Sequence, residues 1–432
     1  MNILVISDLW DDQNAEGNTY SNWFFGKEWQ DDIFSNFFWR AQQPQNHVCQ
    51  DYYRVTEIEL LRKIFTPCKI GEHFLYCDQS ETGICQNNSG SREKKMIAWL
   101  HKHPFHVIYA VKEFLQRNVN WRNRRFIQYL EKFNPSIVFG TAGGVGVLPA
   151  FVYCIRKHTN AKIVLYLSDD WISRYEKYPW YRRRILIRNY VWGIQHADKL
   201  YGATELLCQE YGRKYNVEIT PLYKGCQLSE IPQSNNEVVK LVYAGNLFYG
   251  RDETLVAFAA ALKKCNETVP RAMLEIYTGT PVSDELRKKL DIPGASQIMG
   301  QRPYEEIKEI LNTADIVLHV ESFQQEQIDY VHYSFSTKII DCLQSGSVTM
   351  AIGPAGIASV EYIRNIPGTV VVDDLQKIPD MLGELLEKRD RFPEMTRQSR
   401  EFAKKNHDIQ SVRENLRADF EALLKSDSSY ND

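Results

Sequence analysis

One run of the chain, Ser334–Ile363, constrains its fold more than any other segment: SFSTKIIDCLQSGSVTMAIGPAGIASVEYI. We expect a helix that begins near Thr337, because Ile339, Ile340 and Leu343 recur at the spacing of a buried helical face. A short β-branched strand follows, and a Gly-Pro turn then opens a second helix. The segment therefore predicts a helix, strand and helix of an α/β sheet.

The start of the first helix is a candidate anion site. Ser334 or Ser336 is expected to cap the helix. The free N–H groups at the start of the helix and the positive end of its dipole favour an anion at Ser336, Thr337 and Lys338. Lys338 adds a full charge, and Asp341 lies on the same face one turn further along. This arrangement suits a diphosphate followed by a ribose, whose diol donates to an acid. An ordinary αβ unit with a capping serine is the alternative interpretation.

This segment resembles the donor-binding half of GT-B glycosyltransferases, particularly family 4, where a helix with Ser/Thr-Lys and then an acid precedes a strand and a Gly-rich turn. A second matching element is KLVYAGNLFYGRDETLVAFAAAL, a strand, a Gly-containing loop and a helix. Family members commonly carry two basic residues five apart in this loop, and here those positions are Asn246 and Arg251. The resemblance implies that Gly245, Asn246 and Arg251 bind the donor, with Arg251 and Lys338 clamping the diphosphate. A solvated surface arginine is the alternative for Arg251.

Glu321 ends the predicted strand ADIVLHVE. Because ligands of open α/β sheets bind outside the carboxyl ends of the strands, we expect Glu321 to contact the nucleotide or the sugar. The family often has an acid eight residues before the ribose acid, and Tyr333 occupies that place here. The resemblance implies a retaining reaction, although this departure leaves the sugar contacts and the stereochemical outcome open.

Length and element order predict a two-domain α/β protein, because 432 residues exceed one typical core. The resemblance implies GT-B architecture, with two Rossmann-like doubly wound domains that face each other across a cleft. We expect an N-terminal acceptor-binding domain at residues 1–225 and a donor-binding domain at residues 238–405. Residues 406–432 are expected to form a C-terminal helix that packs back on the first domain.

The first half contains the candidate acceptor residues. MNILVISDLW is expected to be the first strand, and the following loop has the family's position for the acceptor loop, with Glu16, Gly17 and Asn18 as polar contacts. Asp170 ends the predicted strand KIVLYLSDDW and is the candidate general base for an acceptor hydroxyl. Its alternative role is to cap the helix that follows. Many family members have a histidine near this strand end, and this chain has none there.

Neither a metal nor a cofactor is expected. The 9 cysteines lack CxxC spacing, and Asp169 and Asp170 do not form the Asp-x-Asp arrangement of metal-dependent sugar transferases. We reject GTAGGVG, residues 140–146, as a dinucleotide fingerprint because its glycine spacing is wrong and it does not follow the first strand. In the glycosyltransferase interpretation, Gly143 and Gly144 let this loop pass close to the cleft.

Two basic segments, Arg117–Phe126 and Tyr178–Ile194, interleave arginines with aromatic and aliphatic residues. This pattern suits an anionic membrane surface, and amphipathic helices with a solvated arginine face are the alternative. A nucleic-acid partner is not expected, because the net charge is −3 and no recognition module surrounds these segments. No run reaches the roughly eighteen apolar residues of a spanning helix. We therefore expect a cytoplasmic protein, with peripheral binding to the inner face of the cell membrane as a further expectation.

The resemblance implies a metal-independent hexosyltransferase that moves a sugar from a UDP- or GDP-sugar to a hydroxyl of a lipid-linked glycan in cell-surface polysaccharide synthesis. Two alternatives stay open: a nucleotide-sugar epimerase of GT-B fold, and a catalytically silent glycosyltransferase-like partner subunit. Asn246, Tyr333 and the missing histidine favour the silent partner. The basic aromatic segments favour transfer over epimerisation.

Overall fold

The computed structural model describes residues 1–12, 15–66, 68–75, 106–142, 148–230 and 236–426. The chain forms two compact units. The first unit contains Met1–Ala203, Cys208–Leu222 and the residues from Arg413 onward, and the second contains Thr204–Leu207 and Tyr223–Val412. The second unit thus begins before the expected linker and ends inside the last helix.

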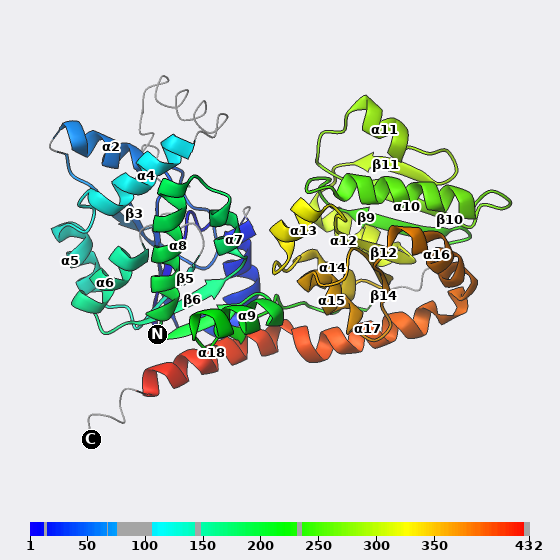
Figure 1. Cartoon of the computed structure of the whole chain (residues 1–432). Helices are drawn as coiled ribbons and strands as arrows, with labels where there is room; N and C mark the ends of the chain where they lie inside the picture. Colours follow the sequence, from blue (N-terminus) through cyan, green and yellow to red (C-terminus); the bar gives the residue numbers. More distant parts are fainter. Residues whose placement is uncertain (13–14, 67, 76–105, 143–147, 231–235, 427–432) are drawn as a thin grey trace, which may run out of the picture. The chain divides into compact units, whose positions relative to one another are not determined.

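A six-stranded parallel sheet forms the centre of the second unit, with the order β11-β10-β9-β12-β13-β14 (Figure 1). Numbered along the chain this is 3-2-1-4-5-6, the order of a Rossmann fold, and it reverses direction between β9 and β12. The strands are Val239–Ala244 (β9), Ala272–Tyr277 (β10), Ser296–Gly300 (β11), Ile316–Val320 (β12), Val348–Ile352 (β13) and Val370–Val372 (β14).

Helices cover both faces of this sheet because its strands alternate between two apolar clusters. Leu241 packs in a cluster with α10 and α16, whereas the neighbouring Val242 packs in a cluster with α12. On that second face, α14 and α17 pack together through Ile340 and Ala403. The helices are Arg251–Cys265 (α10), Asp284–Leu290 (α11), Tyr304–Thr313 (α12), Gln325–Val331 (α13), Lys338–Gln344 (α14), Ala358–Arg364 (α15), Ile378–Glu387 (α16) and Phe392–His407 (α17).

An eight-stranded sheet forms the centre of the first unit, with the order β4-β3-β2-β1-β5-β6-β7-β8. Among the described strands of this sheet, β4 pairs antiparallel with β3 and the other pairs are parallel. Within this sheet, the strands β3-β2-β1-β5-β6-β7 repeat the 3-2-1-4-5-6 order when β4 is left out of the numbering. Both units are therefore Rossmann-like and doubly wound. The strands are Asn2–Ile6 (β1), Ile33–Phe38 (β2), Asp51–Arg54 (β3), Glu72–Leu75 (β4), Ile137–Thr141 (β5), Lys162–Leu167 (β6), Lys199–Gly202 (β7) and Thr220–Pro221 (β8).

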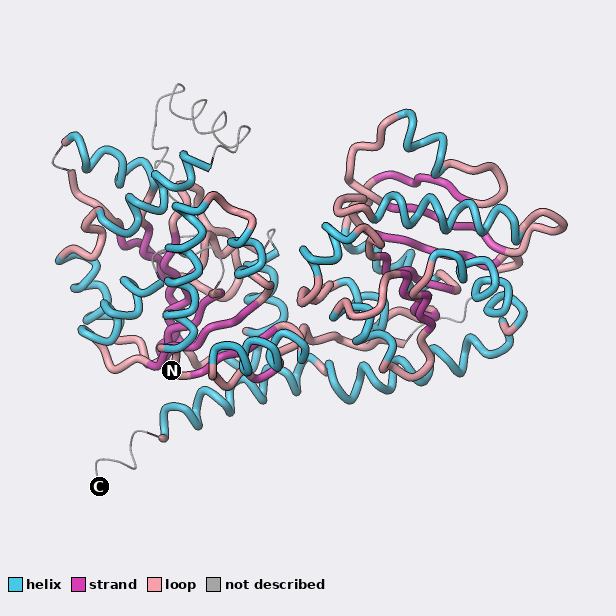
Figure 2. The backbone as a smooth tube through the Cα atoms, viewed as in Figure 1, coloured by secondary structure: helices cyan, strands magenta, loops and turns pink. Residues whose placement is uncertain are grey.

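Aromatic side chains fill much of the core of the first unit, whose helices lie on both sides of the strands (Figure 2). The rings of Phe25 and Phe34 have centroids 4.9 Å apart, and Trp10 and Trp29 contact the same group. The helices are Ala15–Asn18 (α1), Glu57–Phe65 (α2), His106–Asn118 (α4), Arg124–Phe133 (α5), Leu148–His158 (α6), Trp171–Glu176 (α7), Trp180–Gln195 (α8) and Glu205–Tyr215 (α9).

The last helix, Ile409–Lys425 (α18), contributes its C-terminal part to the first unit. Phe420 is fully buried, and its ring centroid lies 5.5 Å from that of Trp29. Arg417 pairs with Asp32 at 2.6 Å. An apolar ring and an ion pair therefore both fix this helix to the segment before β2.

Candidate functional site

Two neighbouring strands bring the predicted donor residues together. β9 ends at Ala244, before Gly245 and Asn246, and β12 ends at Val320, before Glu321. These strands pair where the strand order reverses. Doubly wound sheets bind ligands at such a switch point, outside the carboxyl ends of the strands. The sheet topology thus places these residues where a ligand is expected.

Arg251 is the first residue of α10, and its guanidinium group forms hydrogen bonds with other side chains of the protein. Its Nη2 donates to both carboxylate oxygens of Glu321, at 3.1 and 3.0 Å, and its Nη1 donates to Asn246 Oδ1 at 2.9 Å. Glu321 is only 2% exposed. Burial raises the pKa of the Glu321 carboxyl, and the charge of Arg251 acts against that rise.

This pair adds a contact that the sequence does not reveal. Arg251 and Glu321 stay predicted donor contacts, and in the structure the Glu321 carboxylate lies on the Arg251 guanidinium. The physical reason is that a carboxylate buried without a partner has a large desolvation penalty, so the nearest cation pairs with it. Asn246 binds Arg251 through its oxygen, which leaves its amide nitrogen as the group able to donate to a ligand.

Lys338, the first residue of α14, supplies the positive charge that remains. In the part of the chain that the structure describes, its ammonium group has no hydrogen-bond or ion-pair partner. Burial lowers the pKa of Lys338 to about 8, and the neighbouring charge of Arg251 acts in the same direction. Its Nζ lies 5.9 Å from the ring centroid of Tyr243. A Cβ at Gly245 would lie 2.3 Å from that nitrogen, so any side chain at position 245 would displace the ammonium group.

The charges around the switch point sum to an excess of one positive charge. Arg251 and Glu321 neutralise each other, and Lys338 remains. His319 in β12 adds no charge near pH 7, because burial lowers the pKa of its imidazole to about 3. An anionic ligand is therefore favoured beside Lys338.

The start of α14 differs from the serine-capped start that the sequence predicts. Its N-cap residue is Thr337, and neither this residue nor Ser336 caps the helix through its side chain. The Ser336 N–H donates to Ser359 Oγ at 3.0 Å, and that hydroxyl donates to the Ser334 carbonyl oxygen at 3.0 Å. Ser359, on α15, thus fixes this segment by a tertiary contact that local capping preferences do not reveal. Ser336 and Thr337 stay predicted donor contacts next to Lys338.

Asp341 lies one turn after Lys338 and is already paired. Its Oδ1 accepts from Lys224 Nζ at 2.8 Å and from the Tyr304 hydroxyl at 3.3 Å. The sequence points to Asp341 as a ribose contact but misses both partners, which are 117 and 37 residues away along the chain. No local pattern marks either partner, because contacts at such separations exist only in the folded chain.

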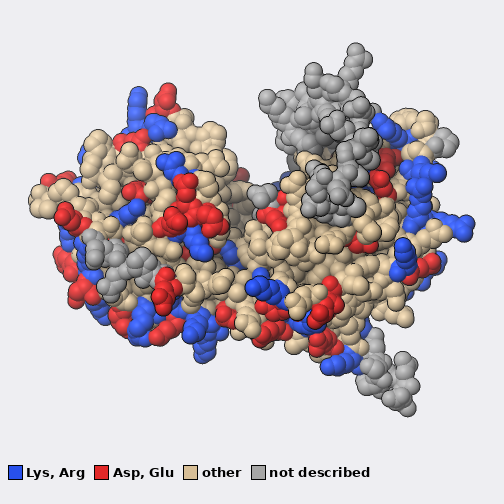
Figure 3. All heavy atoms as spheres, turned by 180° about the vertical axis from the view of Figure 1, so that it is seen from behind, with Lys and Arg blue, Asp and Glu red and all other residues tan. Residues whose placement is uncertain are grey.

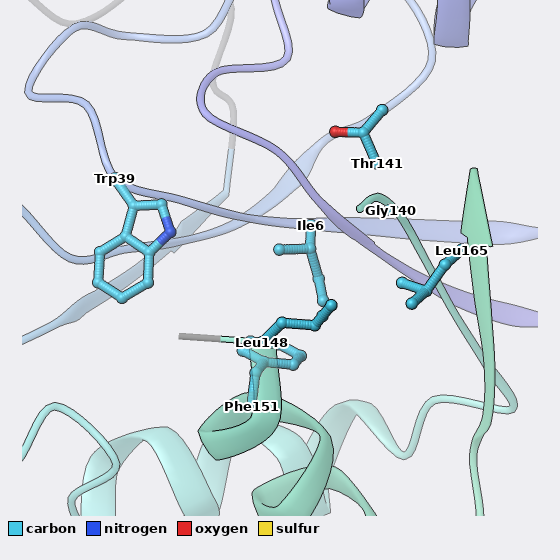
Figure 4. A pocket seen from close by; sticks show the side chains of 7 residues that line it. All are labelled: Ile6, Trp39, Gly140, Thr141, Leu148, Phe151 and Leu165. Atoms are coloured by element: carbon cyan, nitrogen blue, oxygen red, sulfur yellow. The ribbon is translucent and has the colours of Figure 1, made fainter. Parts of the chain in front are cut away.

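In the first unit, Glu16 lies beside the switch point between β1 and β5. Its Oε1 accepts from the Tyr20 hydroxyl at 2.8 Å and from Thr141 Oγ1 at 2.7 Å, and Thr141 is the last residue of β5. Burial raises the pKa of the Glu16 carboxyl. The same strand ends contribute to an apolar pocket, whose lining is Ile6, Trp39, Gly140, Thr141, Leu148, Phe151 and Leu165 (Figure 4).

The rest of the predicted acceptor loop folds back on itself. A Cβ at Gly17 would lie 2.2 Å from the Asp11 carbonyl oxygen, so the backbone can approach only at a glycine. Asn18 Nδ2 donates to the Asp12 carbonyl oxygen at 3.4 Å. The three residues stay predicted acceptor contacts. Gly143 and Gly144 lie outside the described residues.

Asp170 occupies the capping role that the sequence offers as its alternative. It is the N-cap residue of α7, its Oδ1 accepts from Ser173 N at 3.0 Å, and the same oxygen accepts a hydrogen bond from the Tyr211 hydroxyl. The side chain is 3% exposed. A general base has to reach the hydroxyl that it deprotonates. These contacts therefore argue against Asp170 as the catalytic base.

The two basic segments lie partly in the core. Trp121 and Phe126 are fully buried, so they are not rings at a membrane surface. Arg182 is 6% exposed and its Nε donates to Glu113 Oε2 at 3.2 Å. The start of α8 is different, because Trp180 is 76% exposed. Exposed basic residues follow it at Arg183, Arg184 and Arg188.

Comparisons with known proteins support the fold from structure alone. No protein-family model matches this chain, and a search of curated protein sequences found no match. HepE from Anabaena, solved in complex with UDP, is similar with a TM-score of 0.64 and 10% sequence identity, over 98% of this chain and 100% of that chain.

Two further solved structures are similar over nearly their whole length. Sucrose-phosphate synthase from Thermosynechococcus elongatus has a TM-score of 0.61 and 12% identity, over 98% of this chain and 99% of that chain. The α,α-trehalose 6-phosphate synthase from Burkholderia multivorans has a TM-score of 0.58 and 11% identity, over 100% of this chain and 98% of that chain. Two Rossmann-like units and this likeness along nearly the whole chain show that the protein has the GT-B fold.

Proposed function

We propose that this protein is a glycosyltransferase that moves a sugar from a nucleoside-diphosphate donor to a hydroxyl acceptor. The observation that carries this proposal is the unneutralised Lys338 ammonium group beside Gly245, at the switch point of the second sheet. HepE, which has a similar fold, is solved with UDP and with UDP-glucose. That likeness supports a nucleotide sugar, with UDP- and GDP-hexoses as the proposed donors.

The transfer step that we propose relies on the second unit. Lys338 and the amide nitrogen of Asn246 bind the diphosphate and stabilise the charge that develops as it leaves. Arg251 acts mainly by holding Asn246 and Glu321 in place. The reaction is proposed to retain the anomeric configuration without a metal, with the donor phosphate taking the acceptor proton. This route needs no protein base, which fits the capped state of Asp170.

We further propose a lipid-linked glycan as the acceptor, in cell-surface polysaccharide synthesis at the cytoplasmic membrane face. Support comes from Trp180 and Arg184, which are exposed one turn apart on α8. In the described part of the chain, no helix is long and apolar enough to cross a membrane. Positive and negative side chains lie close together along the lower part of the face in Figure 3.

Ligand-induced stabilisation tests the donor proposal. The purified protein is heated with UDP, GDP, TDP, CMP or NAD, and one diphosphate is expected to raise the unfolding midpoint above the others. Lys338→Ala should weaken binding of that diphosphate by about 1.5–3 kcal/mol, because a charge-assisted contact is lost. Lys289→Ala is the matched control, since Lys289 is 57% exposed on α11 of the same unit.

The outcomes separate the candidate functions. Binding of a diphosphate with transfer from its sugar conjugate supports a glycosyltransferase, and interconversion of the sugar conjugate supports an epimerase. Binding without turnover supports the silent partner subunit. No response to any diphosphate, or a response to NAD alone, contradicts the donor site.

A further inference from the structure

Lys224 connects to the candidate donor site although it lies far from it in the sequence. Its ammonium group donates to Asp341 Oδ1 at 2.8 Å, and its side chain is only 9% exposed. The Asp341 side chain is 18% exposed. Within the described residues, the hydrogen bonds to Asp341 all reach Oδ1, from Lys224, Tyr304 and Gln344. The Oδ2 atom therefore keeps its acceptor capacity.

The backbone around Lys224 is held rigidly by a second segment of the same unit. The Lys224 carbonyl oxygen accepts from His407 Nδ1 at 3.0 Å, and Cys226 N donates to the His407 carbonyl oxygen at 2.6 Å. Ile409 N then donates to the Cys226 carbonyl oxygen at 3.0 Å. These bonds form a parallel bridge between Cys226 and Asp408.

His407 is suited to this role because it stays neutral. Burial lowers the pKa of its imidazole to about 4, so one ring nitrogen donates and the other accepts near pH 7. With Nδ1 donating to Lys224, Nε2 is the acceptor, and it is paired with the Tyr362 hydroxyl. The backbone of Lys224 is thus held by His407, whose two ring nitrogens both have hydrogen-bond partners, and its side chain is held by Asp341.

We propose that Lys224 is a positioning residue for the nucleotide: it holds Asp341 by Oδ1, so that Oδ2 accepts from the vicinal hydroxyls of a ribose. This inference rests on the proposed function, because it needs a nucleotide beside Lys338. Lys224 acts through Asp341, since a buried ammonium that already pairs with a carboxylate has little capacity for a ligand. Lys338 carries the diphosphate, and the Lys224–Asp341 pair selects the sugar of the nucleoside.

The preference for a ribose over a deoxyribose tests this proposal. Calorimetry compares UDP with 2′-deoxy-UDP, and GDP with 2′-deoxy-GDP. The wild-type protein should prefer the ribonucleotide by about tenfold, the size of one hydrogen bond to a charged group. Lys224→Met and Asp341→Asn should each reduce that preference toward onefold, and the double variant should lose no more than the stronger single variant. Lys224→Arg should retain most of the preference.

A matched control and a second variant keep the test decisive. Lys240→Met removes another lysine of the same unit, one that pairs with Glu275 at 3.1 Å, and should leave the preference unchanged. If Lys224→Met unfolds, Lys224→Gln takes its place, with a preference between those of the methionine and arginine variants. The proposal is overturned if the wild-type protein binds the ribonucleotide and the 2′-deoxyribonucleotide equally well. It is also overturned if a Lys224 variant weakens the binding of both nucleotides by the same factor. If the wild-type protein binds neither diphosphate, the proposed function itself fails.

Discussion

The two units share one strand order but differ in the charges beyond the carboxyl ends of their strands. In the first unit, the candidate residues Glu16 and Asp170 are carboxylates, and each accepts a hydrogen bond from a tyrosine. In the second unit, Lys338 is a cation that neither Glu321 nor Asp341 pairs with. The same topology therefore locates both sites, whereas the partners of the charged side chains decide which ligand each site favours.

This difference has a simple electrostatic origin. A neutral hydroxyl satisfies a buried carboxylate without adding a compensating positive charge, so Glu16 and Asp170 give their surroundings no attraction for a phosphate. In the second unit one carboxylate, Glu321, meets two cations, and only one of them is neutralised. We expect polar, uncharged groups at the first switch point and an anion at the second.

The largest effect is expected from breaking the ion pair of the second unit. Glu321→Gln leaves Arg251 and Lys338 as two neighbouring cations with no counter-charge, and should lower the free energy of unfolding by about 3 kcal/mol. Urea unfolding followed by circular dichroism measures this loss. Glu326→Gln, at an exposed position of α13, is the control and should have little effect. A stable Glu321→Gln protein would show that the pair does not define this site.

A smaller effect is expected at the matching carboxylate of the first unit. Asp170→Ala removes the α7 cap and the hydrogen bond that the Tyr211 hydroxyl donates to Asp170, and should lower the free energy of unfolding by about 2 kcal/mol. Diphosphate affinity should not change, because the donor residues belong to the other unit. Turnover per folded molecule should also stay near the wild-type value. A large fall in turnover with a normal unfolding midpoint would restore Asp170 as the catalytic base.

The pH dependence of diphosphate binding sharpens the assignment of Lys338. The pKa of this lysine in the folded protein is about 8, so it is charged below that pH and loses its proton above it. Affinity should be steady from pH 7 to 8 and then fall by up to about tenfold per pH unit until the contribution of the charge is lost. Calorimetry across this range measures the fall.

Lys338→Arg is the control for that prediction. An arginine stays charged throughout this range, so the fall above pH 8 should disappear. A fall that persists in the arginine variant would assign the titration to another group.

The smallest effect is expected at the exposed start of α8, where Arg184 lies on the surface of the first unit. Arg184→Gln should weaken binding to phosphatidylserine vesicles by about 1 kcal/mol, the contribution of one basic residue near an anionic surface. Vesicle sedimentation measures it, and Arg287→Gln, half-exposed in the second unit, is the control. Unchanged binding would mean that α8 has an ordinary solvated arginine face. Arg182 is unsuitable for this test because its pairing with Glu113 is structural.

Local patterns predicted the elements of the donor site but not how they are bonded. The strand before Gly245, the helix that carries Lys338 and the strand before Glu321 each follow from short-range periodicity, and the structure contains all three. The serine cap was wrong, because the Ser336 N–H donates to Ser359, 23 residues away along the chain. The pairing of Arg251 with Glu321, 70 residues away, was not predicted.

The sequence by itself determined the α/β class and the positions of the chemical groups, because apolar periodicity and turn residues act over a few positions. Only the tertiary structure decided which charges remain available. It buried Glu321 against Arg251, placed the Tyr211 hydroxyl on Asp170 and brought Lys224 to Asp341. The physical reason is that the cost of burying a charge depends on every neighbour in space, and those neighbours come from segments that the sequence keeps far apart.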